Sequence, residues 1–282
     1  MTYLMSVILG VVQGVAEFLP ISSSGHLTLL QYFFGMENTD NLFNILLHFA
    51  TLLAVCVVYF QDIAEMVVEF FALIGDMFQG RRSKGNPPEA RRLILLLIVG
   101  TLPLFVVLLV KDYVEALGNS PVFVSCALLV TGCILFFSDR MGRGYKTARN
   151  ATLKDVLLVG IAQGLATVPG ISRSGSTISA GMACGFERKF AVRYSFLMSL
   201  PAVLGATLLE VVDVMQAGEG IPEGMLPKYL LGMAIASVVG YFSIQLVNLL
   251  ASKGKFGAFA YYCWAAGAIS LVAYFLGFRF VG

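Results

Sequence analysis

The segment QGVAEFLPISSSGH, residues 13–26, is the most polar interruption in the first apolar stretch of the chain. It contains a carboxylate, a proline, three serines and a histidine, and apolar sequence flanks it on both sides. A helix that crosses a bilayer rarely carries such residues, because unpaired backbone and charged groups are costly in hydrocarbon. The segment therefore predicts a break in a membrane-embedded helix, either buried in protein or lining a polar cavity.

A second segment, QGLATVPGISRSGS at residues 163–176, repeats this pattern. Aligning residues 10–25 with residues 160–175 needs no gap and gives eight identities in sixteen positions. Shared glycine and serine content does not readily produce the same order, QGxA followed by ISxSG. We therefore interpret the chain as an internal duplication, with a first unit at 1–138 and a second unit at 139–282.

The composition is typical of a polytopic membrane protein. Hydrophobic residues make up 58% of the 282 residues, and charged residues make up 13%, against about 25% in soluble domains. The net charge of +2, without a basic face or interleaved aromatic and basic residues, argues against a nucleic-acid partner. We expect no cleavable signal peptide, because no lysine or arginine precedes Arg81.

Apolar runs predict six transmembrane helices and two broken segments. The helices are expected at about 41–61, 93–110, 120–138, 194–213, 228–250 and 258–277. The broken segments, about 4–35 and 156–185, are expected to be re-entrant helical hairpins. Each unit then contains one hairpin and three spans, and because three is odd the second unit has inverted topology. The predicted fold is an all-α polytopic membrane protein with an inverted-topology repeat, whose two broken segments meet near the membrane midplane.

Basic residues predict the orientation. Fifteen of the 19 lysines and arginines fall on one side of this topology, in the segments 81–92, 140–154, 188–193 and 253–255. The positive-inside rule assigns that side to the cytoplasm and both termini to the outside. The segment 62–79 has four acidic residues on one helical face, so we expect an interfacial helix or a cytoplasmic extension of the preceding span.

The polar residues at the two breaks suit a phosphate ligand. We expect helices to restart near Leu27 and Ser176, and helix N-termini offer unpaired N–H groups to an anion. Arg173 adds a planar fork of donors that can bind phosphate oxygens in pairs. The hydroxyl groups expected around the phosphate belong to Ser22, Ser24, Ser172, Ser174, Ser176 and Thr177.

Glu17 needs a different role, because a bare carboxylate repels phosphate. We expect it to bind a divalent cation shared with the phosphate or to act as a base. Gln13, four residues earlier on the same helical face, could supply a neutral oxygen ligand. His26 could attack phosphorus, move a proton or orient a serine. For His48, four residues after Asn44 in a predicted span, we favour hydrogen bonding between helices over a direct role.

These motifs resemble the undecaprenyl-pyrophosphate phosphatase family, the bacitracin-resistance membrane phosphatases. The resemblance rests on an (E/Q)xxxE motif at Gln13–Glu17, FLPISSSGH at 18–26, PGISRSGSTIS at 169–179 and YSFLMSLPAVLGA at 194–206. It extends over essentially the whole chain. It implies hydrolysis of the C55 polyprenyl pyrophosphate to the monophosphate and phosphate, at the outer face of the bacterial cytoplasmic membrane. This reaction recycles the lipid carrier for peptidoglycan synthesis and confers bacitracin resistance.

The resemblance also implies site residues and a cofactor. Glu17, Ser23, His26 and Arg173 take the catalytic positions, and Glu17 and Gln13 take those of ligands to Mg²⁺ or Ca²⁺. Some members have glutamate at the position of Gln13, so the metal role depends chiefly on Glu17 here. Whether His26 or a motif serine attacks phosphorus stays open. The alternative function is a transporter or flippase of the polyprenyl phosphate carrier, because paired re-entrant hairpins are also a transporter layout. A homo-oligomer is compatible with the sequence.

Overall fold

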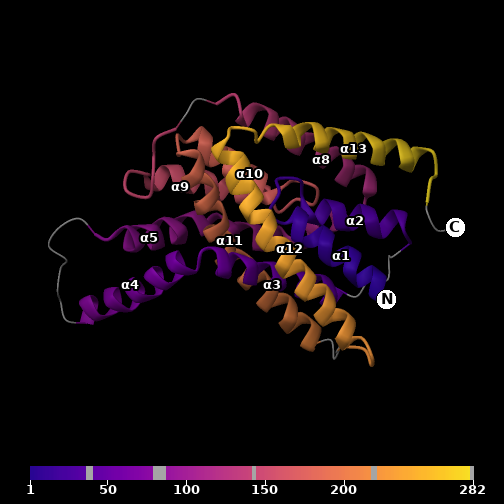
Figure 1. The fold of residues 1–282 in the computed structure, drawn as a ribbon, viewed down its shortest axis with the longest axis horizontal. Helices are drawn as coiled ribbons and strands as arrows, with labels where there is room; N and C mark the ends of the chain where they lie inside the picture. The colour runs from indigo at the N-terminus through magenta and orange to yellow at the C-terminus, as the bar shows by residue number, and fades with distance from the viewer. Residues whose placement is uncertain (36–40, 79–86, 142–143, 217–220, 280–282) are drawn as a thin grey trace.

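The computed structural model describes residues 1–35, 41–78, 87–141, 144–216 and 221–279, and almost all of these residues lie in helices or short connections (Figure 1). The helices in chain order are α1 (Tyr3–Ala16), α2 (Ser23–Phe33), α3 (Asn41–Val58), α4 (Phe60–Phe78), α5 (Glu89–Thr101), α6 (Pro103–Val107), the 3₁₀ turn η1 (Leu108–Val110), α7 (Lys111–Gly118), α8 (Pro121–Ser138), α9 (Leu153–Leu165), α10 (Arg173–Ala183), α11 (Arg188–Gln216), α12 (Leu226–Ser252) and α13 (Ala258–Phe275).

Five helical runs in the described residues are long and apolar enough to cross a membrane: Glu89–Val110, Pro121–Ser138, Arg188–Val214, Leu226–Ser252 and Ala258–Phe275. The bent pair α3 and α4 gives a sixth candidate. This confirms the predicted all-α polytopic membrane protein, while the inverted relation of its halves stays a prediction. The run from Glu89 is divided at Leu102, because Pro103 begins α6 and has no N–H for an uninterrupted helix.

Helix α4 is neither a straight extension of α3 nor isolated. The two helices meet at an angle of 85°. The acidic face of α4 turns toward α5, where Arg91 contacts Glu69 at 3.1 Å and Asp76 at 3.0 Å. These ion pairs join α4 and α5 into the arm that projects from one side of the molecule in Figure 1. The pairing accounts for two of the four acidic residues on that helical face.

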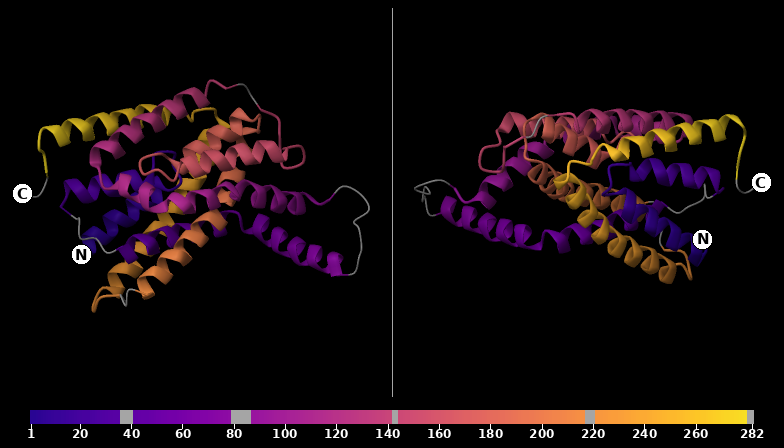
Figure 2. Two further views of the ribbon diagram at one scale, coloured as in Figure 1. Left: turned by 180° about the vertical axis from the view of Figure 1, so that it is seen from behind. Right: turned by 45° about the horizontal axis from the view of Figure 1, so that its top comes forward.

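Basic segments from distant parts of the chain come together at one end of the structure. Arg193 pairs with Asp62 and Glu89, and Arg149 also pairs with Glu89, at 3.2 Å. Lys146 donates to both carboxylate oxygens of Asp155, and these hydrogen bonds raise the pKa of Lys146. The predicted basic residues Arg81, Arg82, Lys84 and Arg143 lie outside the described residues. The start of α1 and the end of α13 lie on the side away from the α4–α5 arm (Figures 1 and 2).

Each broken segment consists of two short helices, α1 with α2 and α9 with α10. The second helices begin at Ser23 and Arg173, not near Leu27 and Ser176 as the sequence suggested. The reason is N-capping. The Ser22 hydroxyl accepts the N–H of Gly25 at 3.3 Å, and the Ser172 hydroxyl accepts that of Gly175 at 3.1 Å. The predicted phosphate-binding serines therefore belong to the caps and first turns of these helices.

Glycines at equivalent positions of the two segments bring their first helices against long neighbours. A Cβ at Gly10 of α1 would collide with the backbone oxygen of Gly232 in α12. A Cβ at Gly160 of α9 would collide with that of Gly100 in α5. Small residues of this kind allow close helix packing in membranes. The two glycines therefore allow α1 to pack closely on α12, and α9 on α5.

Candidate active site

The two breaks touch each other in the interior of the helix bundle. A Cβ at Gly25 would lie 3.0 Å from the Cα of Gly170, and a Cβ at Gly175 would lie 3.2 Å from the Cβ of Pro20. The Ser174 hydroxyl donates to the backbone oxygen of Leu19 at 3.4 Å. Residues about 150 positions apart therefore form one polar junction.

Glu17 is the centre of this junction, and only 7% of its surface is exposed. Its Oε2 atom accepts hydrogen bonds from the Ser23 hydroxyl at 2.7 Å and the Gln13 amide at 3.1 Å. Its Oε1 atom accepts one from the Arg173 guanidinium, which also balances its charge. His48 of α3 places Nε2 3.8 Å from Oε2. One carboxylate thus joins the two breaks and α3.

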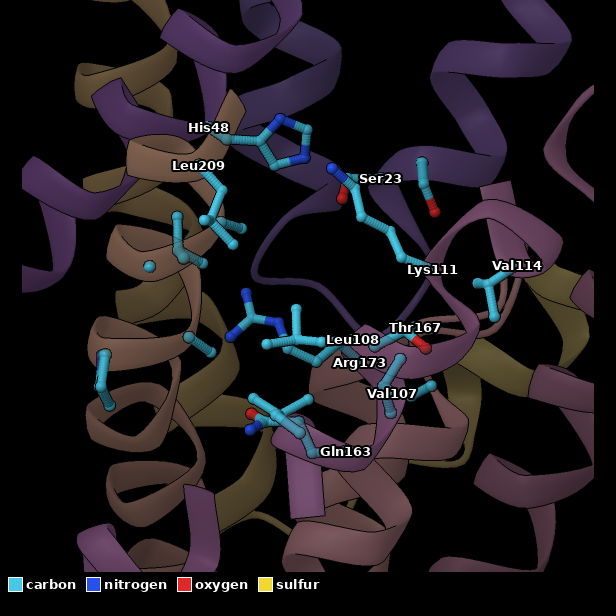
Figure 3. Close-up of a pocket in the computed structure, with 18 of the residues that line it drawn as sticks. Ser23, His48, Val107, Leu108, Lys111, Val114, Gln163, Thr167, Arg173 and Leu209 are labelled. Atoms are coloured by element: carbon cyan, nitrogen blue, oxygen red, sulfur yellow. The ribbon is translucent and has the colours of Figure 1, made fainter. Parts of the chain in front are cut away.

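The junction opens into a cavity of about 790 Å³ (Figure 3). Polar residues that line it include Glu17, Ser23, His48, Gln163 and Arg173. The walls that extend from this polar region are mostly apolar, and they include Leu104, Leu108, Val203, Leu208, Leu209 and Val212. The cavity therefore combines charged and hydroxyl groups with a hydrocarbon-lined surface, which suits an amphiphilic ligand.

His26, a predicted catalytic residue, does not line this cavity. Its Nδ1 atom donates to the backbone oxygen of Ser22 at 2.8 Å, and its Nε2 atom lies 2.8 Å from the hydroxyl of Tyr262. The imidazole is stacked on the Tyr262 ring, with centroids 5.6 Å apart. His26 therefore contacts Tyr262 of α13 and the turn that carries Ser22 and Ser23, and it does not border the cavity.

The predicted phosphate-binding hydroxyls divide into two groups. Ser22, Ser24 and Ser172 line the cavity beside Ser23. The others do not. Ser174 bonds to the first break, Ser176 faces a smaller apolar cavity between α8 and α10, and Thr177 lies 2.6 Å from the Ser195 hydroxyl.

Two residues with no predicted role in the site, His48 and Gln163, line the cavity. His48 donates from Nδ1 to the backbone oxygen of Asn44 at 2.9 Å, which leaves Nε2 toward Glu17. Gln163 is 1% exposed and lines the same cavity. The alignment of the two segments contained the signal for Gln163, since it occupies the position of Gln13.

The junction offers a divalent cation a limited set of ligands. Among the described residues, no three His, Cys, Asp or Glu side chains are grouped closely enough to hold a metal. The Gln13 Oε1 atom, however, is buried and accepts no hydrogen bond, although its amide nitrogen contacts Glu17. The oxygen atoms that a divalent cation would use at this junction are those of the Glu17 carboxylate and Gln13 Oε1, with its other ligands from phosphate and water, as is common for Mg²⁺.

Comparisons with known proteins show the family of this chain. Residues 6–269 match the family model described as bacitracin resistance protein BacA. A protein of Treponema denticola named undecaprenyl-diphosphatase is 42% identical, with 99% of each chain aligned. Proteins with the same name from Desulforapulum autotrophicum and Methanosphaera stadtmanae are 41% and 40% identical, over 96% and 95% of this chain and 98% and 97% of theirs. The chain belongs to the BacA family of bacitracin resistance proteins.

Proposed function

We propose that this protein is an undecaprenyl-diphosphatase, which hydrolyses the C55 polyprenyl pyrophosphate to the monophosphate and phosphate. The observation that carries the proposal is the hydrogen bond between Ser23 and Glu17, beside Arg173, at the polar end of an apolar cavity. A diphosphate needs cationic and hydrogen-bonding groups, and a prenyl chain needs an apolar surface. The name shared by the curated relatives supports the same reaction.

In this proposal Ser23 is the attacking group, because its hydroxyl already donates to Glu17. Glu17 takes the hydroxyl proton as the Ser23 oxygen bonds to the terminal phosphorus. The bond from that phosphorus to the bridging oxygen breaks, and its electron pair leaves with the lipid monophosphate. Glu17 then releases the proton to solvent.

Water completes the turnover by attacking the phosphoserine. Glu17 takes one proton from this water and passes it to the Ser23 oxygen as the bond between that oxygen and phosphorus breaks. Inorganic phosphate leaves with the oxygen of the water, and both residues return to their starting states. His26 supports this chemistry as a positioning residue, since it holds the backbone of the turn that carries Ser23.

Arg173 stabilises the charge that develops on the phosphoryl oxygens. Its guanidinium has five N–H donors, so contact with Glu17 leaves others for phosphate. The backbone N–H groups at the start of α2 and α10 add partial positive charge. A divalent cation, Mg²⁺ or Ca²⁺, held by Glu17 and Gln13, would supply Lewis-acid stabilisation of the phosphate.

We further propose that the site serves the outer face of the bacterial cytoplasmic membrane and that both termini lie outside. The basic segments gather at one end of the structure, and the positive-inside rule places this end in the cytoplasm. Hydrolysis at the outer face would recycle the lipid carrier for cell-wall synthesis and remove the target of bacitracin.

A lipid transporter is the second candidate, and the matched packing of the two segments favours it. Gly10 and Gly160 occupy aligned positions and make equivalent close approaches to α12 and α5. Inverted repeats with such paired segments are common in transporters. Movement of polyprenyl phosphate across liposomes by the purified protein, without phosphate release from the pyrophosphate, would favour this function.

The decisive experiment measures phosphate release from undecaprenyl pyrophosphate by the purified protein in detergent. We expect release by the wild type, at least 100-fold slower release by Ser23→Ala and Glu17→Ala, and loss of release after addition of EDTA. Ser199→Ala is a matched control, because the buried Ser199 hydroxyl bonds within its own helix and does not line the cavity. Absence of release from folded wild-type protein would contradict the proposed function.

A further inference from the structure

Gln163 is a buried amide that has no hydrogen-bond partner among the described residues. Its residue surface is 1% exposed, and both its Oε1 and Nε2 atoms lack a partner. The side chain lines the same cavity as Glu17, Ser23 and Arg173. In Figure 3 the Arg173 guanidinium lies between the Gln163 amide and the His48 ring.

A buried amide without a hydrogen bond lowers the stability of the folded protein. Transfer of an amide from water to apolar surroundings is unfavourable unless a hydrogen bond replaces those to water. An apolar residue of similar size would fill the position without this cost. The Gln163 side chain lines the cavity, so a polar ligand that enters the cavity and reaches this buried amide can pair with it.

The first break contains the same glutamine with a different partner. Gln13 donates to Glu17, four residues later. The residue four positions after Gln163 is Thr167, whose hydroxyl donates to the backbone oxygen of Gly164 at 2.7 Å. The second glutamine therefore has the position of the first but no carboxylate to bind, and its two N–H donors have no acceptor among the described residues.

We infer that Gln163 binds the second phosphoryl group of a diphosphate whose first phosphoryl group contacts Arg173. This inference rests on the proposed function and assigns a specificity-determining residue to the same cavity. A single phosphoryl group on Arg173 leaves Gln163 unpaired, whereas a diphosphate reaches both. Gln163 thus favours the diphosphate substrate over the monophosphate product, which assists product release.

Binding measurements test the inference without turnover. The probes are a polyprenyl methylenediphosphonate, which cannot be hydrolysed at the bridging position, and the polyprenyl monophosphate of the same chain length. Dissociation constants in detergent are measured by calorimetry for the wild type, Gln163→Leu, Gln163→Glu and the control Gln245→Leu. Gln245 is exposed on α12 and does not line the cavity.

We expect Gln163→Leu to weaken diphosphonate binding about tenfold or more and monophosphate binding less than about twofold. Gln163→Glu weakens diphosphonate binding further, because it adds a like charge, and Gln245→Leu changes neither constant. The melting temperature of Gln163→Leu should equal or exceed that of the wild type. Gln163→Met provides the same test if the branched leucine side chain prevents folding.

Equal losses for both probes, unchanged diphosphonate binding, or no diphosphonate binding by the wild type would each overturn the inference. Phosphate release, measured in parallel, reports on the proposed function separately. If the wild type releases phosphate and Gln163→Leu binds the diphosphonate as tightly as the wild type does, only the proposed role of Gln163 is refuted. If Gln163→Leu selectively loses diphosphonate binding but the wild type releases no phosphate, the diphosphate subsite is supported and the proposed hydrolase activity is refuted.

Discussion

Replacement of Arg173 by glutamine tests whether its ion pair with Glu17 holds the two breaks together. The Glu17 side chain is 6% exposed and that of Arg173 is 20% exposed, so the pair is largely shielded from water. Removing one partner of a buried pair costs about 3–5 kcal/mol, because the remaining charge is uncompensated. Glu17 keeps its hydrogen bonds from Gln13 and Ser23, so we expect the lower end of this range, about 3 kcal/mol.

Removal of both charges should reverse most of this loss. The double variant Glu17→Gln/Arg173→Gln leaves no unpaired charge at the junction, and we expect its stability to lie within about 1 kcal/mol of the wild type. Arg149→Gln is the matched control. The Arg149 side chain is 81% exposed and pairs with Glu89, so its replacement should cost less than about 1 kcal/mol.

Thermal unfolding of the purified variants in one detergent measures these differences. At this chain length, about 1 kcal/mol corresponds to slightly less than about 2 °C in melting temperature. Arg173→Gln should therefore melt about 5 °C below the wild type, and the control within about 2 °C. The reasoning is refuted if Arg173→Gln is no less stable than Arg149→Gln, or if the double variant is as unstable as Arg173→Gln alone.

Three other predictions concern packing, positioning and the cation. Gly160→Ala should lower stability by about 1–3 kcal/mol in thermal unfolding, because its Cβ would collide with Gly100, whereas Gly75→Ala, which meets open space, should be neutral or stabilising. His26→Gln, which can still donate to Ser22, should retain more phosphate release than His26→Ala at equal melting temperature; equal loss would instead indicate direct chemistry by the imidazole. Mg²⁺ or Ca²⁺ in excess should restore the release that EDTA removes, and full activity in EDTA would exclude the cation.

The sequence was sufficient to predict the helical membrane fold, because apolar runs of spanning length are read directly from composition. It also located both breaks, since proline, glycine and serine interrupt otherwise apolar sequence. The starts of α2 and α10 were predicted several residues late. Capping by Ser22 and Ser172 brings the following residues into the helices, and the serine-rich pattern alone did not distinguish a cap from a loop.

The set of residues that form the site was harder to predict, because it depends on contacts between segments that are distant in the sequence. Arg173 was found because its planar fork of donors suits phosphate, and Glu17 because a carboxylate beside phosphate needs another role. The structure joins the two directly. His48 lies on a different helix, and its approach to Glu17 follows only from the packing of α3. The same holds for His26, which neighbours Ser23 in sequence but is turned toward Tyr262.

The alignment of the two segments suggests why one site, not two, arises from matched halves. Identical positions such as Gly10 and Gly160 allow close helix packing in both segments. The positions that differ carry the distinctive groups: Ser23 aligns with Arg173, and Glu17 aligns with Thr167. Since Glu17 binds both Ser23 and Arg173, the first segment supplies the hydroxyl and carboxylate while the second supplies the cationic donor. The differences at these two aligned positions therefore give the two similar segments distinct chemical roles in a single site.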